Sequence, residues 1–413
     1  MWNSENQDRA QDAGAGRWAE PAGPDWSLMR SGPFHRFQQT LHLEDSRNPR
    51  TARRAVLFAL VTWAPLAALA AVQGLAINDD PRRSLLLDFT VYARFLVAVP
   101  LFILGESVGD DRYSMIISYL LRSGIVAGSE RQAYDDLLSS TRRLRDSRVA
   151  EILWALLAYA GAFLSVFFYH AMSEQSSWLV DGAAGLSPLS WAGGWYVAVS
   201  LPLFQFLLYR TIWSWLIWVR FLRRLSRLRL HLTPTHPDLA GGLNILGDSP
   251  YAIAVFIFAI GAVLSSALIM QVSYKGAPVV IYHKVFTVYL LLALMISFGP
   301  LLVFLGKLDR LRQQGLRDYG TLASRHTQLF DEKWINRAGV TEDEGEVPLG
   351  SPDISSISSL KASYETVKRV RFFPFGLRAL LVLAAAALIP MVPLMLMEFP
   401  LQKILKTIAG VIF

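Results

Sequence analysis

The sequence contains no cysteine and carries little charge. Without cysteine, a disulfide framework, a thiolate metal site and a cysteine nucleophile are all excluded. Charged residues make up 18% of the 413 positions, whereas about a quarter is usual in soluble domains. Apolar residues make up 53% and the mean hydropathy is +0.33. This composition is typical of a protein that spans a lipid bilayer and is stabilised by the packing of its helices.

Motifs for enzymatic chemistry are missing as well. The chain has no P-loop, dinucleotide fingerprint, His-Glu-x-x-His zinc helix, nucleophile elbow or potassium-filter sequence. Enzymatic activity therefore has no support, and we expect no cofactor and no metal. The formal charge of +7 could suggest nucleic acid, but the basic residues gather at the ends of apolar runs, as membrane topology signals do. We expect no nucleic-acid partner.

Seven apolar runs have the length needed to cross a bilayer of about 30 Å. They lie at about 55–77, 85–104, 150–171, 195–219, 251–272, 285–305 and 377–397. The sequence therefore predicts an all-α polytopic membrane protein with about seven transmembrane helices and a helical cytoplasmic layer.

The distribution of lysine and arginine predicts the orientation, because cytoplasmic loops carry the excess. The segments 1–54, 105–150, 220–250 and 306–376 contain 31 of these residues, and the intervening connections with the final tail contain six. The amino end is therefore expected in the cytoplasm and the carboxyl end outside. A bacterial inner membrane fits this pattern best.

The chain divides into four parts on this basis. Residues 1–54 are predicted as a disordered cytoplasmic tail with a short amphipathic segment. Residues 55–305 form a six-helix membrane core with cytoplasmic helix extensions at 105–150 and 220–250. Residues 306–376 form a cytoplasmic helical segment with an acidic linker at 339–353. The last span and an outer amphipathic tail occupy 377–413.

Two segments carry a resemblance to a known family. One is the Thr-His-Pro-Asp-Leu-Ala-Gly-Gly sequence at 235–242, and the other runs from Gly-Ser-Pro-Asp-Ile at 350–354 to Pro-Phe at 374–375. With them the chain resembles an uncharacterised family of bacterial multi-pass inner-membrane proteins over most of residues 50–413. The resemblance implies the membrane spans and a bacterial source, and it implies no activity and no functional residue.

Two arginines fall within apolar runs. Arg94 lies about ten residues into the second run, and Arg210 lies ten residues before the basic boundary at Arg220, which predicts a depth near the midplane. Each would cost at least about 2.5 kcal/mol there unless it faces protein or water. One interpretation is that both line a hydrated path for an anion. The other is a structural role, through an ion pair with Asp88 or through hydrogen bonds to carbonyls freed by prolines.

A polar turn follows the fourth run. His236 and Asp238 lie two residues apart beside Gly241 and Gly242 and are candidates for the cytoplasmic mouth of such a path. Two possible ligands do not make a metal site, and the pattern favours a proline-set turn in which Asp238 caps a following short helix.

A basic helix precedes this turn. Its arginines recur at helical spacing on one face: Arg220, Arg223, Arg224 and Arg227. Anionic lipid head groups are the expected partner, since each basic residue near the surface adds about 1 kcal/mol to binding. The acidic linker, at 342–346, or a soluble ligand are alternatives.

Two functional hypotheses follow. The first is an anion-favouring channel or carrier with Arg94 and Arg210 near the path and a homo-oligomeric assembly. The second is a membrane sensor or scaffold that recruits a cytoplasmic partner and transports nothing.

Overall fold

The computed structural model describes residues 27, 51–172, 177–180, 189–275, 278–335 and 352–398. The described residues form helices and no β-strand, which confirms the predicted all-α class. Most of the predicted tail at 1–54, the linker at 339–353 up to residue 351, and the tail beyond 398 lie outside the described residues.

Seven helical stretches in the described part are long and apolar enough to cross a membrane. They agree with the seven predicted runs. Their elements, in chain order, are α3 (Thr51–Val72); α4 (Phe89–Tyr92), η3 (Ala93–Ala98) and α5 (Val99–Arg122); α7 (Arg148–Met172); α8 (Trp191–Trp195), η5 (Tyr196–Ser200) and α9 (Leu201–Leu225); η6 (Leu243–Asp248) and α10 (Ser249–Lys275); α11 (His283–Phe298), η8 (Gly299–Phe304) and α12 (Leu305–Phe330); and α14 (Leu377–Leu388), η10 (Ile389–Met391) and α15 (Val392–Glu398).

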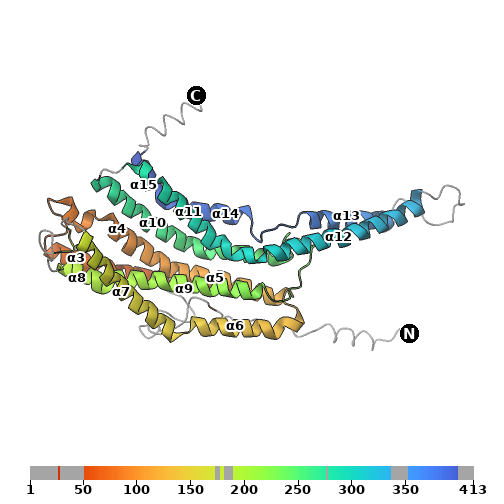
Figure 1. Ribbon diagram of the computed structural model, residues 1–413, viewed down its shortest axis with the longest axis horizontal. Coiled ribbons are helices and arrows are strands. Elements are labelled where there is room, and N and C mark those ends of the chain that lie inside the picture. Colours follow the sequence, from red (N-terminus) through yellow and green to blue (C-terminus); the bar gives the residue numbers. More distant parts are fainter. Residues whose placement is uncertain are drawn as a thin grey trace, which may run out of the picture.

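Shorter elements connect the spans. They are η1 (Pro81–Arg83), η2 (Leu85–Leu87), η4 (Gly128–Glu130), α6 (Arg131–Arg145), η7 (Val279–Tyr282), η9 (Asp331–Ile335) and α13 (Pro352–Lys368). The molecule is elongated along its helices (Figure 1). We call the end that carries α6, α12 and α13 the basic end, and the end that carries η1, η2 and η7 the opposite end.

Helices fill most of residues 105–150, where helix extensions were predicted. The second span continues as α5 to Arg122, so residues 105–122 extend that span. The third span does not begin as one continuous helix, because α6 ends at Arg145 and α7 begins at Arg148. The break lets α6 pack along α9 at the basic end, with Tyr134 and Leu137 buried.

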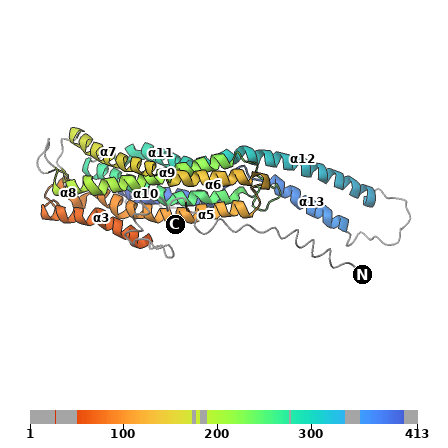
Figure 2. The same ribbon diagram turned by 90° about the horizontal axis from the view of Figure 1, so that it is seen from below.

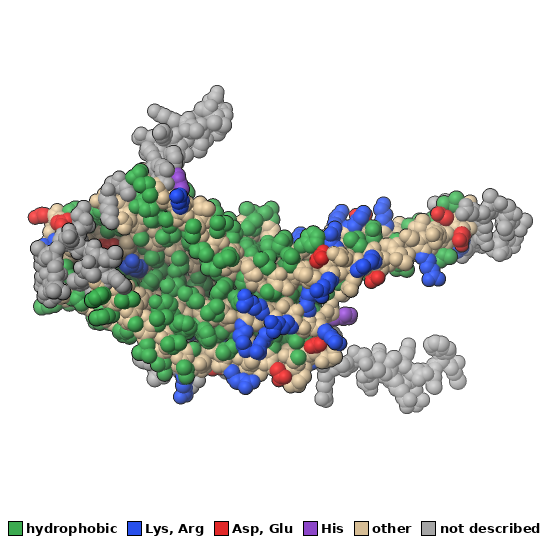
Figure 3. Space-filling view, in the orientation of Figure 1, with side chains coloured by type: hydrophobic (Ala, Val, Ile, Leu, Met, Phe, Trp, Pro, Cys, Tyr) green, Lys and Arg blue, Asp and Glu red, His purple; other side chains and the backbone are tan. Residues whose placement is uncertain are grey.

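The outer surface of the bundle is apolar. On α7, side chains on one face such as Ile152, Leu156 and Phe163 are 60–69% exposed. Figure 3 shows hydrophobic side chains over most of the bundle and lysine and arginine gathered toward the basic end. Exposed apolar side chains at this density are expected to face lipid rather than water.

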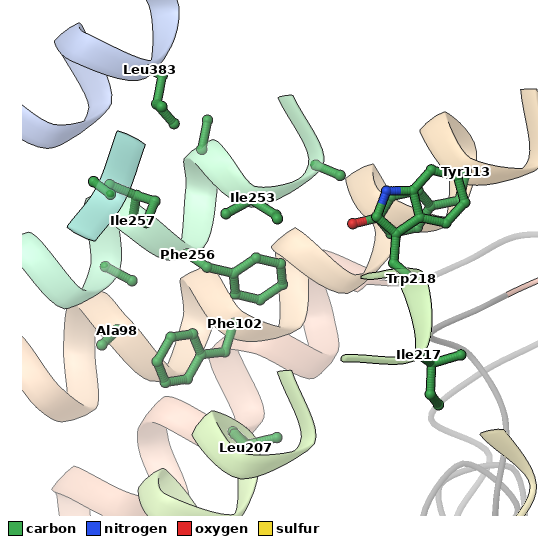
Figure 4. Packing of buried hydrophobic residues seen from close by; sticks show 14 of the residues in the cluster. Ala98, Phe102, Tyr113, Leu207, Ile217, Trp218, Ile253, Phe256, Ile257 and Leu383 are labelled. Atoms are coloured by element: carbon green, nitrogen blue, oxygen red, sulfur yellow. The ribbon is translucent and has the colours of Figure 1, made fainter. Parts of the chain in front are cut away.

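The interior of the bundle is also apolar and rich in aromatic rings. Phe102 of α5 stacks on Phe256 of α10 with ring centroids 6.0 Å apart (Figure 4). It also stacks on Phe204 of α9 at 5.7 Å. Toward the basic end, the rings of Tyr113 and Trp218 lie 4.2 Å apart, and both side chains are buried. These contacts hold α5, α9 and α10 together along their length.

A helical arm extends from the basic end. Helices α12 and α13 pack side by side and project beyond the bundle (Figures 1 and 2). At its tip, Asp353 at the start of α13 accepts hydrogen bonds from Lys333 Nζ at 2.8 Å and from Trp334 Nε1 at 3.2 Å. These two bonds lower the pKa of the Asp353 carboxyl.

Candidate functional site

A buried ionic cluster joins three of the spanning helices. Glu106 of α5 lies between Arg54 of α3 and Arg210 of α9, with N–O distances of 3.7 Å and 3.3 Å. Each of the three side chains is at most 9% exposed. We call Arg54, Glu106 and Arg210 the ionic cluster.

The charges of the cluster are nearly balanced. Two arginines and one glutamate sum to one positive charge, and Asp110, one helical turn after Glu106, is also buried. Its carboxylate accepts a hydrogen bond from Ser27 Oγ at 2.7 Å. Removing a charge from water costs several kcal/mol, so buried charges persist only when they are closely paired. The two ion pairs of Glu106 are therefore needed for α3, α5 and α9 to pack against one another at the ionic cluster.

The cluster places Arg210 level with the start of the first span. Arg54 pairs with the same carboxylate and stands directly before the first apolar run. Helix α9 continues past Arg220 to Leu225 and packs against α6. The depth of Arg210 in a bilayer stays a prediction.

A second polar network lies toward the opposite end. Arg94 Nη1 donates a hydrogen bond to the Tyr196 hydroxyl at 2.6 Å, and the ring of Trp178 packs edge-on against the Tyr196 ring. Trp178 Nε1 donates to the Asp88 carboxylate at 3.1 Å. We call Asp88, Arg94, Trp178 and Tyr196 the tyrosine network. It brings together two of the predicted pathway residues, Asp88 and Arg94.

The predicted ion pair with Asp88 does not form within the described residues. Asp88 Oδ1 accepts hydrogen bonds from the amide and hydroxyl of Thr90 at 3.0 Å and 2.6 Å, as the N-cap of α4. Its Oδ2 accepts a hydrogen bond from Trp178 Nε1, and the Arg94 guanidinium donates to the Tyr196 hydroxyl instead. The aromatic side chains thus stand between the two charges.

Both helices of the tyrosine network are irregular at the same place. Arg94 lies in the π-helical turn η3, and Tyr196 begins the π-helical turn η5. Pro100 and Pro202 each follow two residues after these turns. A proline lacks the amide hydrogen that an α-helix needs, and a π turn rearranges the freed carbonyls. Such turns are frequent at functional sites.

The two networks lie at two depths of one helix. About 18 Å of helix separates Arg94 from Glu106, at 1.5 Å rise per residue. The stacked rings of Phe102, Phe204 and Phe256 fill the layer between them. A polar layer, an aromatic layer and an ionic layer therefore follow one another from the opposite end toward the basic end.

The polar turn after α9 is held by Asp238. Its carboxylate accepts hydrogen bonds from the amides of Ala240, Gly242 and Asn244 at 2.8–3.1 Å, and its Oδ1 lies 2.8 Å from His236 Nδ1. The described residues contain no group of three metal-ligating side chains here or elsewhere. Asp238 thus holds the turn and reaches Asn244 in η6, while the N-cap residue of η6 is Gly242 rather than Asp238.

The two glycines of the turn have backbone requirements. Gly241 and Gly242 have φ values of +63° and +97°, where residues with a Cβ are strained. A Cβ on Gly241 would also lie 2.5 Å from a methyl group of Leu311 in α12. The two glycines therefore allow the backbone conformation of the turn, and Gly241 also allows the turn to pack against the arm.

The predicted basic face is exposed. Arg220, Arg223 and Arg224 lie on the last turns of α9, while Arg227 follows the end of the helix at Leu225. Arg224 Nη1 donates to Ser140 Oγ on α6 at 3.1 Å. The expectation of one helical face therefore holds for three of the four arginines.

Several residues of both networks were missed from sequence. Glu106 follows the second apolar run, in the predicted helix extension, and was not singled out, and Arg54 was counted only as a topology signal. Trp178 and Tyr196 have no recognisable motif. A signal for Glu106 was present, because Glu106 and Asp110 continue the helical spacing of the apolar run with Gly105 and Gly109 beside them.

Seven apolar spans with charged side chains paired between them define a polytopic membrane protein. Comparisons with protein-family models, with curated proteins and with solved structures found no match to this chain. The family resemblance of the segments at 235–242 and 350–375 therefore stays a prediction. The structure adds that these segments touch, since the Arg371 amide donates to the Leu239 carbonyl at 2.8 Å.

Proposed function

We propose that the protein is a channel or carrier with a preference for anions, placed in a bacterial inner membrane with its amino end in the cytoplasm. The excess of lysine and arginine at the basic end supports this orientation. The observation that supports the proposal most is that the ionic cluster and the tyrosine network lie at two depths of the same bundle and that each contains a buried or partly buried arginine. Ionisable residues between spanning helices commonly mark the pathways of ions and substrates.

Opening requires the ionic cluster to exchange partners. In the closed arrangement the carboxylate of Glu106 occupies the guanidinium groups of Arg54 and Arg210. Arginine presents a planar fork of donors that carboxylate and phosphate groups both accept. An anion that enters from the basic end can therefore bind Arg54 and Arg210 in place of Glu106, whose carboxylate is then released from both ion pairs.

The tyrosine network provides the second barrier. Arg94 is held by one neutral hydroxyl, so its guanidinium can pass to an anion without breaking an ion pair. The π turns and the prolines beside them allow the two helices to bend at this level. Between the two barriers, Phe102 and its stacked partners have to separate for a solute to pass.

Flux in liposomes tests this proposal. Glu106→Gln removes the carboxylate that closes the cluster and is expected to raise anion flux by about tenfold or more. A loss of about 1.4 kcal/mol in the stability of the closed arrangement relative to the open one is enough for a tenfold change in their ratio. Arg210→Gln is expected to reduce the preference for anions over cations. The matched control is Glu365→Gln, which removes an exposed carboxylate on α13.

The control variant should behave as the wild type. If neither wild type nor Glu106→Gln conducts anions or cations under voltage or a concentration gradient, while both remain folded, the transport proposal is wrong.

A membrane sensor or scaffold is the second candidate. The observation that favours it is the projecting α12–α13 arm, on which Leu322 and Leu329 are 52% and 56% exposed one heptad apart (Figure 2). A recruiting arm needs no path through the bundle. This candidate would be supported if the protein gives no ion flux in liposomes and if truncation of the arm tip leaves the stability of the bundle unchanged.

We further propose two kinds of partner. Anionic lipid head groups are suited to the exposed arginines at the end of α9. A second copy of the chain is suited to the broad apolar faces of α7 and α11, which bear exposed residues such as Phe163 and Leu291. Both expectations are open to cross-linking in native membranes.

A further inference from the structure

A cavity of about 510 Å³ lies between four elements at the basic end, away from the two networks. Its lining comes from α5, from η6 and the start of α10, from the connection 369–376, and from the first turns of α14. The charged lining residues are Arg112, Arg371, Arg378 and Asp248. Three arginines and one aspartate give the lining a formal charge of +2.

The arginines of this cavity are available to a ligand. Within the described residues no carboxylate lies at ion-pair distance from Arg112, Arg371 or Arg378. The guanidinium of Arg112 lies 5.5 Å from the centre of the Tyr251 ring, a cation–π contact that holds it in place. A cavity whose lining keeps a charge of +2 beside Asp248 attracts a compact anion.

The chemistry of the lining selects a phosphate group. Arginine binds phosphate oxygens through two parallel hydrogen bonds, and three arginines match a dianion better than a single negative charge. A phosphate monoester carries between about −1.5 and −2 at pH 7, because its second pKa is about 6. A zwitterionic head group adds a positive charge, which the lining repels.

The cavity also has an apolar wall at the level where the last span begins. Ala379 and Val382 of α14 line it, and their neighbours Leu377 and Leu381 are 70% and 59% exposed on the surface expected to face lipid. This combination of a basic pocket and an apolar side suits the head group of a membrane lipid whose chains lie along α14.

We propose that this cavity binds a phosphate monoester dianion through Arg112, Arg371 and Arg378. The monoester head group of a membrane lipid and a free phosphate share this chemistry, and the apolar wall favours the lipid. The site is independent of the proposed transport path, since none of its residues belongs to the ionic cluster or the tyrosine network.

The ligand would also join the arm to the bundle. Arg371 lies in the connection between α13 and α14, and its amide bonds to the turn at Leu239. The adjoining Phe375 packs on Phe298 with ring centroids 4.4 Å apart. A phosphate held by arginines of α5, α14 and this connection therefore fixes the connection against the spans.

Calorimetric titration of the purified full-length protein in non-ionic detergent tests the site. The probes are dihexanoyl phosphatidic acid, dihexanoyl phosphatidylcholine and inorganic phosphate. We expect phosphatidic acid to bind, phosphatidylcholine not to bind, and binding to weaken as the pH falls below about 6. Binding of phosphatidic acid alone assigns the site to a lipid, and equal binding of inorganic phosphate assigns it to a soluble phosphate.

Variants separate the cavity from general surface charge. Arg371→Gln combined with Arg378→Gln is expected to weaken binding about 100-fold or more, since each lost charge-assisted hydrogen bond weakens binding about tenfold or more. Arg378→Lys should weaken it less, because the charge is kept. Arg325→Gln, on the exposed face of α12, is the matched control and should leave binding unchanged.

Three results would overturn the proposal. They are no binding of either phosphate probe, equal binding of phosphatidylcholine, or undiminished binding by the double variant. Because Arg371 and Arg378 are exposed, the variants are expected to fold, and a melting curve of each confirms this before titration.

Discussion

The ionic cluster gives the sharpest prediction for stability. Glu106→Gln keeps the size and shape of the side chain and removes the charge that Arg54 and Arg210 share. Both guanidinium groups then remain in a space where they are at most 9% exposed, and they repel one another. We expect a large destabilisation of the bundle because three helices meet at this one carboxylate.

The magnitude follows from the burial of the pairs. Removing one partner of a buried ion pair typically costs about 3–5 kcal/mol, whereas an exposed pair contributes about 0–1 kcal/mol. Glu106 belongs to two buried pairs, so the upper part of that range is expected. Glu365→Gln, whose pair with Lys368 is about half exposed, should change stability by less than about 1 kcal/mol.

Unfolding in mixed micelles of mild detergent and dodecyl sulfate measures these free energies. The double variant Glu106→Gln with Arg210→Gln should be less destabilised than the sum of the two single variants, since each removes the same pair. A free energy of unfolding for Glu106→Gln within about 0.5 kcal/mol of the wild type would refute the argument, because a change that small is typical of surface substitutions.

Three further predictions concern the basic end. Asp238→Ala removes the acceptor of three amides at the start of η6 and in the turn before it, and should lower stability by about 1–3 kcal/mol, as seen in the melting temperature. Gly241→Ala should cost about 1 kcal/mol or more because of its positive φ and its close neighbour in α12, whereas Gly306→Ala, with open space around it, should be nearly neutral. The pKa of Asp353 is lowered in the folded protein, so its bond to Lys333 is expected to be present above about pH 4 and lost as the pH falls through the lowered pKa. Spin labels on α12 and α13, attached to introduced cysteines in this cysteine-free chain, should report a single distance at pH 7 and a broad one in acid, and an unchanged distance in Asp353→Asn would contradict this role.

The spans could be predicted from sequence because a bilayer imposes a simple length requirement. A run of about 20 apolar residues has few alternatives to a spanning helix. The same rule fails at the ends of helices. It ended the second span at residue 104, while α5 continues to Arg122 with Glu106 and Asp110 buried.

The partners of the buried charges could not be predicted in the same way. The cost of burying Arg94 and Arg210 singles them out, but nothing local to them identifies Glu106 or Tyr196. The fold brings Glu106 of α5 to Arg210 of α9 and Tyr196 of η5 to Arg94 of η3. Arg54 shows the limit most clearly. Before an apolar run it has the pattern of a topology signal, and only the fold shows that it is 2% exposed.

The turn at 235–242 was predictable because its determinants are local. Asp238 accepts hydrogen bonds from amides within the next six residues, and the two glycines supply the positive φ values that follow. Its position against Leu311 of the arm depends on long-range packing and has no counterpart in the local sequence.

Access of water to the layer between the two networks is the most direct test of the proposed path. Ala98 is buried there, and a single cysteine at this position can be probed with an anionic, water-soluble methanethiosulfonate reagent. Leu156→Cys, on the lipid-facing side of α7, is the control because a thiol in lipid does not ionise. The account predicts that Ala98→Cys is protected in the wild type and reacts when Glu106→Gln is also present, while Leu156→Cys reacts in neither. If Ala98→Cys stays protected in a folded Glu106→Gln protein, the ionic cluster does not close a path.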